Sequence, residues 1–378
     1  MKLIVFNQFC SDLSKHWREL ESASENYLFQ NYEWLEHWQQ TVGSKSIYAS
    51  PFIVVFLDSS DQVKLIFPFI IRRNFGVRIL EFMGGSQSDY NGPIIHSDWI
   101  LNICEIHLAW RRVLSIAPKH DIRHFHKLPD KWTVEHNPML YIWPSVFQDK
   151  AYQTLLPSTY KEFQQILRPK LKSDERRQRK RLLEIGCLRF KILLREYLDC
   201  YSSWDSIIDV MIKQKSERLR SVGLPNMFTD SMTRKFYANL QGSATDVLNV
   251  HFSILDLDGR IMATHWGAVY RRRFYYLMPT FASSDWGKYS PGRLLLTDLM
   301  KWSIENGVRV FDFTIGSEEY KNDWCNTEIS LFEHLKSLTP LGRLYLVYIR
   351  IRRRARRNKY IWGMIRSLYK LVLDRCSF

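Results

Sequence analysis

A basic loop with serine, proline and glycine in succession is the stretch of this sequence best suited to hold an anion. It reads Lys288-Tyr289-Ser290-Pro291-Gly292-Arg293. Ser290 is suited to cap a helix, Pro291 suits the first helical position, and Gly292 lets another group approach the backbone closely. The first amides of such a helix, together with its dipole, attract an anion such as phosphate. An ordinary well-capped helix remains the alternative interpretation of the same residues.

Acidic, phenolic and basic side chains that could perform acid–base chemistry follow about twenty residues later. They are Asp312, Glu318, Glu319, Tyr320 and Lys321. A carboxylate whose pKa is raised by desolvation could remove a proton from an attacking amine, and Tyr320 could protonate a leaving group. Alternatively, Asp312 could serve only as a hydrogen-bonding group inside a sheet, and the two glutamates could lie in a solvated turn.

The apolar pattern around these residues predicts a strand, a loop, a helix and a second strand. Residues 274–280 form an apolar run, and residues 294–304 carry apolar side chains at helical spacing. Asn306-Gly307 is a helix stop, and residues 308–313 alternate as a strand does, with Asp312 in an otherwise apolar run. The acidic cluster is therefore expected at the end of the second strand.

The same order of elements occurs twice in the chain. Residues 51–57 and 63–71 predict two strands joined by a turn, and residues 252–257 and 261–270 repeat this pattern about 200 residues later. A predicted helix and strand within residues 99–126 correspond to those within residues 293–314. A period this long indicates duplicated domains. We expect an N-terminal domain over residues 1–155 and a C-terminal domain over residues 156–342.

The formal net charge of +15 belongs to two segments. Residues 168–181 hold eight Lys/Arg and two acidic residues. They could bind an anionic acceptor such as a nucleotide-sugar or a lipid-linked saccharide, or they could form a solvated helix. Basic helices also attract RNA, but no motif with stacked aromatic residues is present, so we expect no specific nucleic-acid partner.

The second basic segment is the C-terminal tail over residues 343–378. Residues 343–375 hold 11 Lys/Arg and one Asp. From Arg350 to Val372 the apolar residues recur at helical spacing among these charges, which is typical of a helix that lies on an anionic membrane surface. A terminal helix packed on the body of the protein, with a solvated arginine face, is the alternative.

Metal binding and secretion are not expected. The six cysteines include no CxxC pair, which fits a reducing cytoplasm, and no apolar window approaches the ~20 residues of a membrane span. His120, His124 and His126 with Asp121 do not fix a coordination geometry. A lone strand histidine, His265, is more typical of a protein core. We expect a cytoplasmic protein, with peripheral attachment to the inner face of the membrane as an option.

Residues 274–321 resemble the acyl-CoA-binding core of the GNAT acyltransferases, in particular the branch named after the cellulose-biosynthesis protein CelD/BcsL. That branch is similar to the FemAB peptidyltransferases in having two GNAT-like halves. The matching stretches are YLMP at 276–279, WGKYSPG at 286–292 and FDFTIG at 311–316, with Tyr320 and Lys321. Weaker matches lie at 27–38, 167–171 and 214–218, and together the stretches cover residues 27–342.

The resemblance implies an α/β fold of tandem GNAT-like (acyl-CoA N-acyltransferase) domains, with mixed sheets flanked by helices and a basic C-terminal helical tail. It implies acetyl-CoA or another acyl-CoA as co-substrate and no metal. The phosphates would lie on the loop from Lys288 to Arg293, and the pantetheine would lie between splayed strands, where the first carries Tyr276 and Met278. The match includes Asp312 and Lys321, which we therefore rank above Glu318.

The expected function is acyl transfer by direct attack, without a covalent enzyme intermediate. The resemblance implies an amine or hydroxyl acceptor on a small molecule or saccharide, such as a cell-envelope, exopolysaccharide or cellulose precursor. The N-terminal domain lacks the Ser-Pro-Gly helix start, so we expect it to be degenerate. Two alternatives remain: a FemAB-like transferase that uses aminoacyl-tRNA, and a non-enzymatic accessory protein docked to a membrane synthase through its tail.

Overall fold

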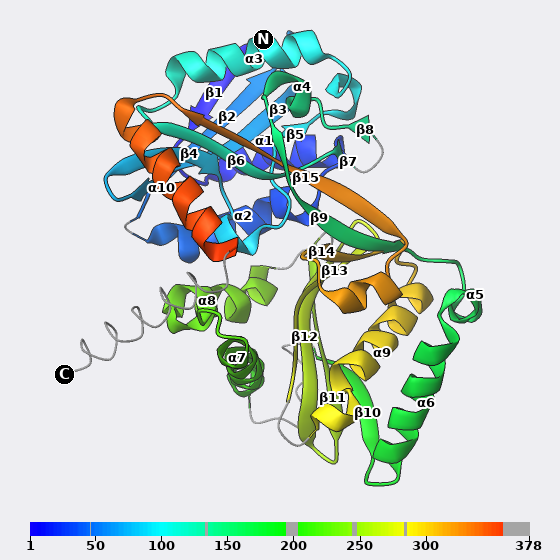
Figure 1. The fold of residues 1–378 in the computed structure, drawn as a ribbon. Helices are drawn as coiled ribbons and strands as arrows, with labels where there is room; N and C mark the ends of the chain where they lie inside the picture. Colours follow the sequence, from blue (N-terminus) through cyan, green and yellow to red (C-terminus); the bar gives the residue numbers. More distant parts are fainter. Residues whose placement is uncertain (46, 133–134, 194–202, 244–247, 283–285, 358–378) are drawn as a thin grey trace, which may run out of the picture.

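The computed structural model describes residues 1–378 except 46, 133–134, 194–202, 244–247, 283–285 and 358–378, and Figure 1 shows its fold. Over the described ranges, one 13-stranded mixed sheet runs through both halves of the chain, with helices on its faces. The expected α/β class, with a mixed sheet flanked by helices, is confirmed.

The first half begins with an edge strand and two helices, continues through three antiparallel strands, and returns through a helix to a strand parallel to the third. The parallel pair is β4 (Val77–Phe82) and β6 (Ile122–Pro129). The other elements are β1 (Lys2–Phe6), α1 (Ser11–Ser22), α2 (Tyr32–Gln40), β2 (Tyr48–Leu57), β3 (Val63–Asn74), β5 (Ile94–Ile95) and α3 (Ile103–Ile116).

The second half repeats this order. Its parallel pair is β13 (Arg273–Phe281) and β14 (Val310–Ile315), joined by α9 (Pro291–Glu305). The preceding elements are β10 (Leu188–Leu193), α7 (Trp204–Ser221), α8 (Ser231–Asn239), β11 (Leu248–Leu257) and β12 (Arg260–Tyr270). The duplication inferred from the sequence is therefore present in the topology, and it extends to β1, α1 and α2, which correspond to β10, α7 and α8.

Two long strands link the halves. β9 (Val146–Leu155) follows the first half in sequence but pairs with β14, and β15 (Thr327–Ser337) follows the second half but pairs with β6. β9 and β15 also pair with each other, and Figure 1 shows them crossing the middle of the molecule. Connecting elements complete the chain: β7 (Lys131–Trp132), β8 (Glu135–His136), α4 (Met139–Ile142), α5 (Tyr160–Ile166), α6 (Pro169–Leu183) and α10 (Pro340–Arg357).

The two halves share one hydrophobic core. Apolar side chains of α1, α2, α7 and α8 pack there with residues of both parts of the sheet. Trp34 on α2 contacts Phe236 on α8 and Trp266 on β12, with ring centroids 5.1 and 6.2 Å apart. Separate cores lie under α3 in the first half and under α6 and α9 in the second. Burial of this shared surface stabilises the two halves together.

Several expected boundaries differ from the structure. α3 begins at Ile103, and Trp99 belongs to a preceding short turn. The tail was expected from residue 343, but α10 begins at Pro340 and includes Gly342. A Cβ at Gly342 would lie 2.3 Å from the Asp121 carbonyl oxygen, so this glycine permits the close approach of α10 to the body of the protein. Residues 358–372 of the expected amphipathic helix lie outside the described residues.

A buried ion pair joins β13 to β14 where the halves meet. Arg273 Nη1 lies 2.9 Å from Asp312 Oδ2, and Asp312 is fully buried. The hydroxyl of Tyr90, from the first half, donates to Asp312 Oδ1 at 2.7 Å, and the Thr314 N–H donates to the same oxygen at 2.8 Å. Arg273 also donates to Gln153 Oε1 on β9 at 2.6 Å. Burial raises the pKa of Asp312, and the nearby guanidinium opposes this rise.

We expect Asp312→Asn to lower the free energy of unfolding by about 3–5 kcal/mol, because the substitution leaves a buried guanidinium without its counter-charge. Urea titration measures the change. Glu328→Gln is the matched control, because Glu328 pairs with Lys150 at 2.5 Å near the surface and such exposed pairs contribute about 0–1 kcal/mol. Equal effects of the two substitutions would contradict a structural role for Asp312.

Two histidines are buried between the sheet and α9. The rings of His251 on β11 and His265 on β12 lie 6.0 Å apart, and within the described part of the chain their nitrogens have no hydrogen-bond partner. His265 stacks on Tyr276 at 4.7 Å, which confirms the expectation that it is a core residue. Burial lowers the pKa of His251 to about 3 and that of His265 well below its ordinary value. Both rings are therefore neutral in the folded protein.

These histidines make stability depend on pH. In the unfolded chain a histidine takes up a proton near pH 6.5, whereas in the folded protein these two do so only at much lower pH. Between these pH values the unfolded state therefore binds more protons than the folded state. Stability should therefore fall as the pH falls below about 6.5, by roughly 1.4 kcal/mol per pH unit for each histidine. In urea titrations between pH 7 and 5, His251→Leu should reduce this slope, and the exposed control His107→Leu should not. An unchanged slope in the first variant would contradict the assignment.

Candidate functional site

The site begins where β13 and β14 separate. The two strands pair in parallel only from Arg273 to Tyr275 on β13 and from Val310 to Asp312 on β14. Beyond these positions β13 runs on to Phe281 and β14 to Ile315 without pairing to each other. This separation leaves room for a ligand to enter between the strands.

A bulge in each strand produces the separation. On β13, Tyr275 faces Ala268 of β12 whereas Met278 faces Trp266, so β13 has one extra residue between these pairs. β14 has a similar irregularity against β9. Gly267 lies beside the first bulge, where a Cβ would lie 2.2 Å from the carbonyl oxygen of Tyr275. The bulge therefore requires glycine at this position of β12.

A cavity of about 360 Å³ lies at the open end of the two strands, against the start of α9. Its wall is mostly apolar, with a few hydroxyl groups and one guanidinium, which is a common composition for small-molecule sites. The lining residues are Thr264, Tyr276, Pro279, Thr280, Phe281, Gly287, Ser290, Pro291, Gly292, Arg293, Leu295, Leu296, Tyr320 and Trp324.

The start of α9 differs in one respect from the expectation. Ser290 stands at the N-cap, but its backbone is left-handed (φ 52°, ψ 51°) and its side chain makes no capping bond. Its carbonyl oxygen instead accepts the N–H groups of Arg293 and Leu294, at 3.0 and 3.2 Å. Pro291 occupies the first helical position, as expected. The Gly292 N–H belongs to the first turn, which has no intrahelical acceptors, and is available to an anion.

The structure separates the other predicted donor-binding residues. Tyr276 lines the cavity. Met278 lies on the opposite face of β13 in the shared core, because the bulge reverses the alternation of side chains. Tyr289 is buried between cations, with Arg181 at 5.0 Å and Lys288 at 5.1 Å from its ring centroid. Lys288 and Tyr289 thus flank the cavity without lining it.

A chain of polar side chains that sequence reasoning missed leads into the cavity. The hydroxyls of Thr264 on β12 and Thr280 on β13 lie 2.6 Å apart, and Thr280 donates to Gln214 Oε1 of α7 at 2.6 Å. Gln214 in turn donates to the Ile261 carbonyl oxygen at 3.3 Å. The two threonines face each other across neighbouring strands, and only the strand register could have revealed this.

The four predicted catalytic residues occupy different surroundings. Asp312 does not line the cavity and is held in the ion pair with Arg273, which favours the hydrogen-bonding role over proton transfer. Tyr320 lines the cavity, and burial together with the Glu318 carboxylate raises the pKa of its hydroxyl. Tyr320 therefore stays protonated near neutral pH and can donate a hydrogen bond.

Lys321 and Glu318 lie at the carboxyl end of β14. The Lys321 ammonium is buried and donates to the carbonyl oxygens of Phe313, Ile315 and Gly316 at 3.0, 3.1 and 3.0 Å. It also pairs with Glu318 at 3.0 Å. Lys321 thus fixes the backbone where β14 ends, whereas the Glu318 side chain remains 58% exposed and accessible to an acceptor.

Lys215 on α7 is a second candidate that the sequence did not single out, beyond its place in a weak family match. Burial lowers the pKa of Lys215, and the Glu318 carboxylate opposes this effect. A lysine that loses its proton more readily can act as a general base. Its neighbour Gln214 belongs to the polar chain that reaches the cavity. These contacts place α7 on the side of the strands opposite α9.

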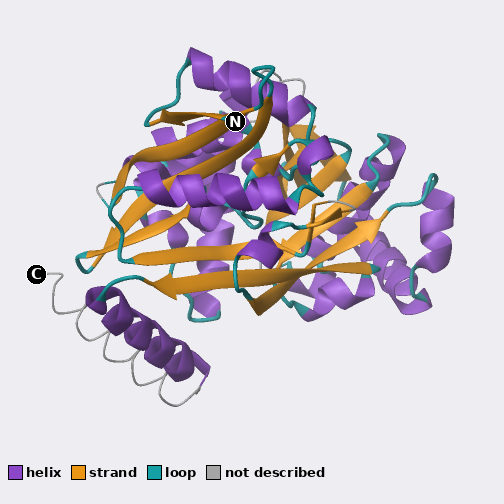
Figure 2. Cartoon of the chain, turned by 90° about the horizontal axis from the view of Figure 1, so that it is seen from above, coloured by secondary structure: helices purple, strands orange, loops and turns teal. Residues whose placement is uncertain are grey.

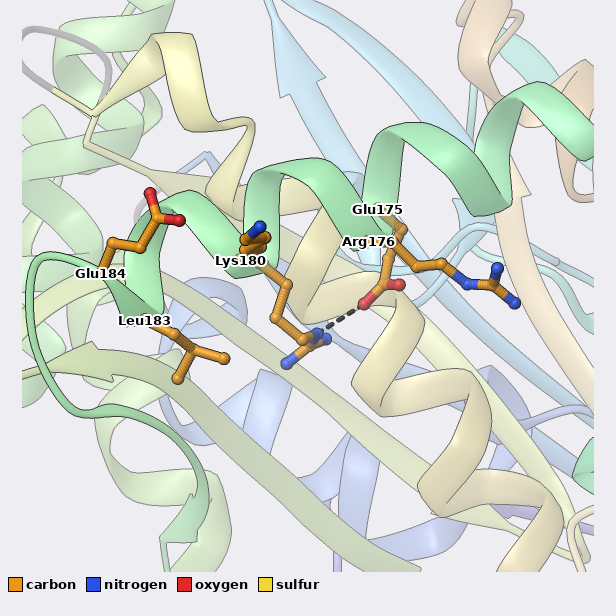
Figure 3. A pocket seen from close by; sticks show the side chains of 6 residues that line it. Glu175, Arg176, Lys180, Leu183 and Glu184 are labelled. Atoms are coloured by element: carbon orange, nitrogen blue, oxygen red, sulfur yellow. Dashed lines mark hydrogen bonds and ion pairs between the residues drawn. The ribbon is translucent and has the colours of Figure 1, made fainter.

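The basic segment forms α6, which packs beside α9. Arg179 pairs with Glu175 at 2.5 Å and with Asp298 of α9 at 2.8 Å, and it thereby docks the helix. A hollow of about 370 Å³ lies along α6, and Figure 3 shows the side chains that line it. They are Glu175, Arg176, Arg179, Lys180, Leu183 and Glu184. Arg176 and Lys180 have no carboxylate partner among the described residues. Part of the predicted basic surface is thus paired, and part remains available.

Among the described residues, no group of three or more potential ligands could hold a metal ion. The histidines considered in the sequence analysis make other contacts, and the rings of His124 and His126 lie 5.0 Å apart. His124 Nε2 lies 2.7 Å from Glu333 Oε1, and Glu333 also pairs with Arg353 of α10 at 2.6 Å. His120 contacts the Pro118 carbonyl oxygen at 2.7 Å. These side chains serve the packing of α10 and of the turn before β6.

Part of the chain is similar to a known protein family. Residues 169–322 match the family described as acetyltransferase (GNAT) domain. No curated protein matches the sequence. The fold is similar to the crystal structure of FemX, with a TM-score of 0.63 and 11% identity over 91% of this chain and 99% of that chain.

Two further structures share the fold. One is a tandem GNAT protein from the clavulanic acid biosynthesis pathway, with a TM-score of 0.50 and 10% identity over 90% of this chain and 99% of that one. The other is the C-terminal domain of a putative lysylphosphatidylglycerol synthetase from Agrobacterium fabrum, with a TM-score of 0.51 and 10% identity over 88% and 95%. The family match covers α9, both separating strands and every residue that lines the cavity except Trp324. Residues 169–322 are therefore similar to a GNAT acetyltransferase domain, and the chain as a whole shares the fold of a tandem GNAT protein.

Proposed function

We propose that the protein transfers an acetyl or related acyl group from acyl-CoA to an amine or hydroxyl of a saccharide or cell-envelope precursor. One observation carries the donor assignment: the cavity is bounded by the separated end of β13, by Tyr320 and Trp324 after β14, and by the first turn of α9. A thioester arm is long, narrow and rich in amides, so it suits the space beside the separated strands. The pyrophosphate suits the helix start, where the Gly292 N–H and Arg293 are available.

The proposed reaction is direct attack of the acceptor on the thioester carbonyl. Backbone N–H groups of the separated strands would polarise the carbonyl, as oxyanion-binding groups do in other acyl transfers. We propose that Tyr320 protonates the leaving thiolate, because it lines the cavity and keeps its proton. Glu318 or Lys215 would accept the proton from the attacking amine on the far side of the strands. Lys321 and Asp312 would act indirectly, by holding the backbone of β14 in position.

The acceptor class is supported by two observations. α6 presents Arg176 and Lys180 beside an open hollow, which suits an anionic carrier such as a nucleotide-sugar. The fold is also shared with FemX and with the domain of a putative lysylphosphatidylglycerol synthetase, whose name points to lipid modification. We propose a cell-envelope precursor on this basis, and the CelD/BcsL assignment and a role in cellulose synthesis remain part of the proposal.

Transfer from aminoacyl-tRNA is the second candidate. The exposed basic side chains of α6 favour it, because they could contact the phosphate backbone of tRNA. Charged tRNA and acetyl-CoA compete in this scheme for the same cavity. Saturable binding of acetyl-CoA, with no effect of charged tRNA, would exclude the second candidate.

We expect Gly292→Leu to abolish acetyl-CoA binding while the protein stays folded. A Cβ at this position would lie 3.1 Å from Phe281 Cδ1, so the added side chain must project into the cavity or displace that ring. Isothermal titration calorimetry measures binding, and thermal unfolding reports folding. Gly307→Asn is the control, because Gly307 lies outside the cavity, its Cβ would meet no atom within 4 Å, and asparagine tolerates its positive φ of 71°. Unchanged affinity in Gly292→Leu would place the donor site elsewhere.

Tyr320→Phe should lower kcat by about 10²-fold, as expected for loss of a general acid, and should leave the KM for acetyl-CoA nearly unchanged. Release of free thiol with glucosamine as amine probe measures the rate. The control is Tyr141→Phe, because Tyr141 is 68% exposed and lies outside the cavity. A rise in KM with unchanged kcat would instead assign Tyr320 to donor binding.

A further inference from the structure

α10 presents two different faces. On one face Tyr345, Leu346 and Ile349 pack against β4, β6 and β15, and Arg353 pairs with Glu333 at 2.6 Å. On the other face a row of apolar side chains points to solvent, with Leu344 70%, Val347 51% and Ile351 63% exposed. Figures 1 and 2 show this helix at one side of the molecule. A packed helix does not ordinarily leave such a stripe uncovered.

The apolar stripe continues onto a neighbouring turn. Phe75, between β3 and β4, is 79% exposed, and its ring lies 6.1 Å from that of Tyr348 on α10. Its backbone has a positive φ of 49°, which a bulky residue adopts only at a cost. A large aromatic residue is therefore held in solvent in an unfavourable conformation without packing inside the fold. Phe75 lies outside α10, and its exposed ring extends the apolar surface formed by the helix.

Arginines flank the stripe. At 100° per residue, Arg343, Arg350 and Arg354 fall along one side of the apolar row and Arg352 along the other. These four side chains have no carboxylate partner in the described part of the chain, and α10 contains no acidic residue. The surface thus combines an exposed apolar row with uncompensated positive charge on both of its sides.

We propose that this surface, made of Phe75 and the exposed face of α10, docks the protein onto an anionic membrane. The apolar side chains would enter the boundary between headgroups and acyl chains, and the arginines would contact lipid phosphates. Helices within the described ranges are too short or too polar to cross a bilayer, so the contact would be interfacial. Membrane docking through this surface is separate from the acyl-transfer reaction, because the surface lies on the first half of the fold and the cavity lies on the second half.

Charge favours a membrane over other occupants. A second copy of the chain would bring two arginine-lined faces together, which is unfavourable without anions between them. Residues 358–378 carry four Lys/Arg and one Asp, so their charge also has the same sign as the surface. An anionic lipid surface is complementary to both the apolar row and its arginines.

Vesicle flotation of the full chain tests the proposal. The wild-type protein should bind vesicles of phosphatidylcholine with phosphatidylglycerol, and bind vesicles of phosphatidylcholine alone at least tenfold more weakly. Higher salt should weaken the binding, because it screens the arginines. Leu344→Ser with Ile351→Ser should lower the partition coefficient at least tenfold. The matched control is Leu101→Ser, which removes an apolar side chain that is 76% exposed away from this surface.

A second pair of variants tests whether binding depends on the arginines of this surface or only on the positive net charge of the protein. Arg350→Glu with Arg354→Glu should reduce binding at least tenfold, since one arginine near an anionic surface contributes about fivefold. Arg176→Glu with Lys180→Glu on α6 changes the net charge equally and should have a much smaller effect. Thermal unfolding verifies that every variant is folded.

Three results would overturn the proposal. Equal binding to both kinds of vesicle, or none, would exclude an anionic membrane as the occupant. Full binding by the serine variants would assign the contact to another segment, such as residues 358–378. Loss of self-association in those variants, without vesicle binding by the wild type, would identify a protein interface.

Discussion

The buried pair between Arg273 and Asp312 is the interaction on which the rest of the site depends. It spans the short stretch where β13 and β14 pair, from Arg273 in the first pair of residues to Asp312 in the last, and both strands bulge and separate beyond it. Tyr90 adds a hydrogen bond from the first half, so the same pair also joins the two repeats. Because a broken buried pair is costly, the strands are held together at one end while their other end stays open.

The fold could be predicted in large part because its elements have strong local patterns. The strand, loop, helix and strand around Lys288–Arg293 and the repeat in the first half follow from apolar periodicity. The positions of β9 and β15 could not be predicted, since strand pairing between distant segments leaves no local pattern. The contact of Gly342 could not be predicted for a related reason: its neighbour is Asp121, far away in the sequence.

The site could be predicted less completely. Pro291 and Gly292 lie at the start of α9, and both line the cavity together with Tyr276 and Tyr320. Their roles in donor binding and proton transfer stay predictions. Met278 is on the opposite face because one extra residue in β13 reverses the alternation. The pairing of Thr264 with Thr280 and the approach of α7 depend on register and tertiary packing, which residue types alone do not specify.

The most direct test of the account is hydrogen–deuterium exchange with and without acetyl-CoA, using ATP as the control. We expect slower exchange in residues 276–281 and 290–296, which contribute most of the lining of the cavity, and in residues 313–315, where β14 no longer pairs with β13. ATP, which lacks the thioester arm, should leave residues 276–281 unchanged. Protection confined to α6, or to the first half of the chain, would show that the donor does not enter between β13 and β14.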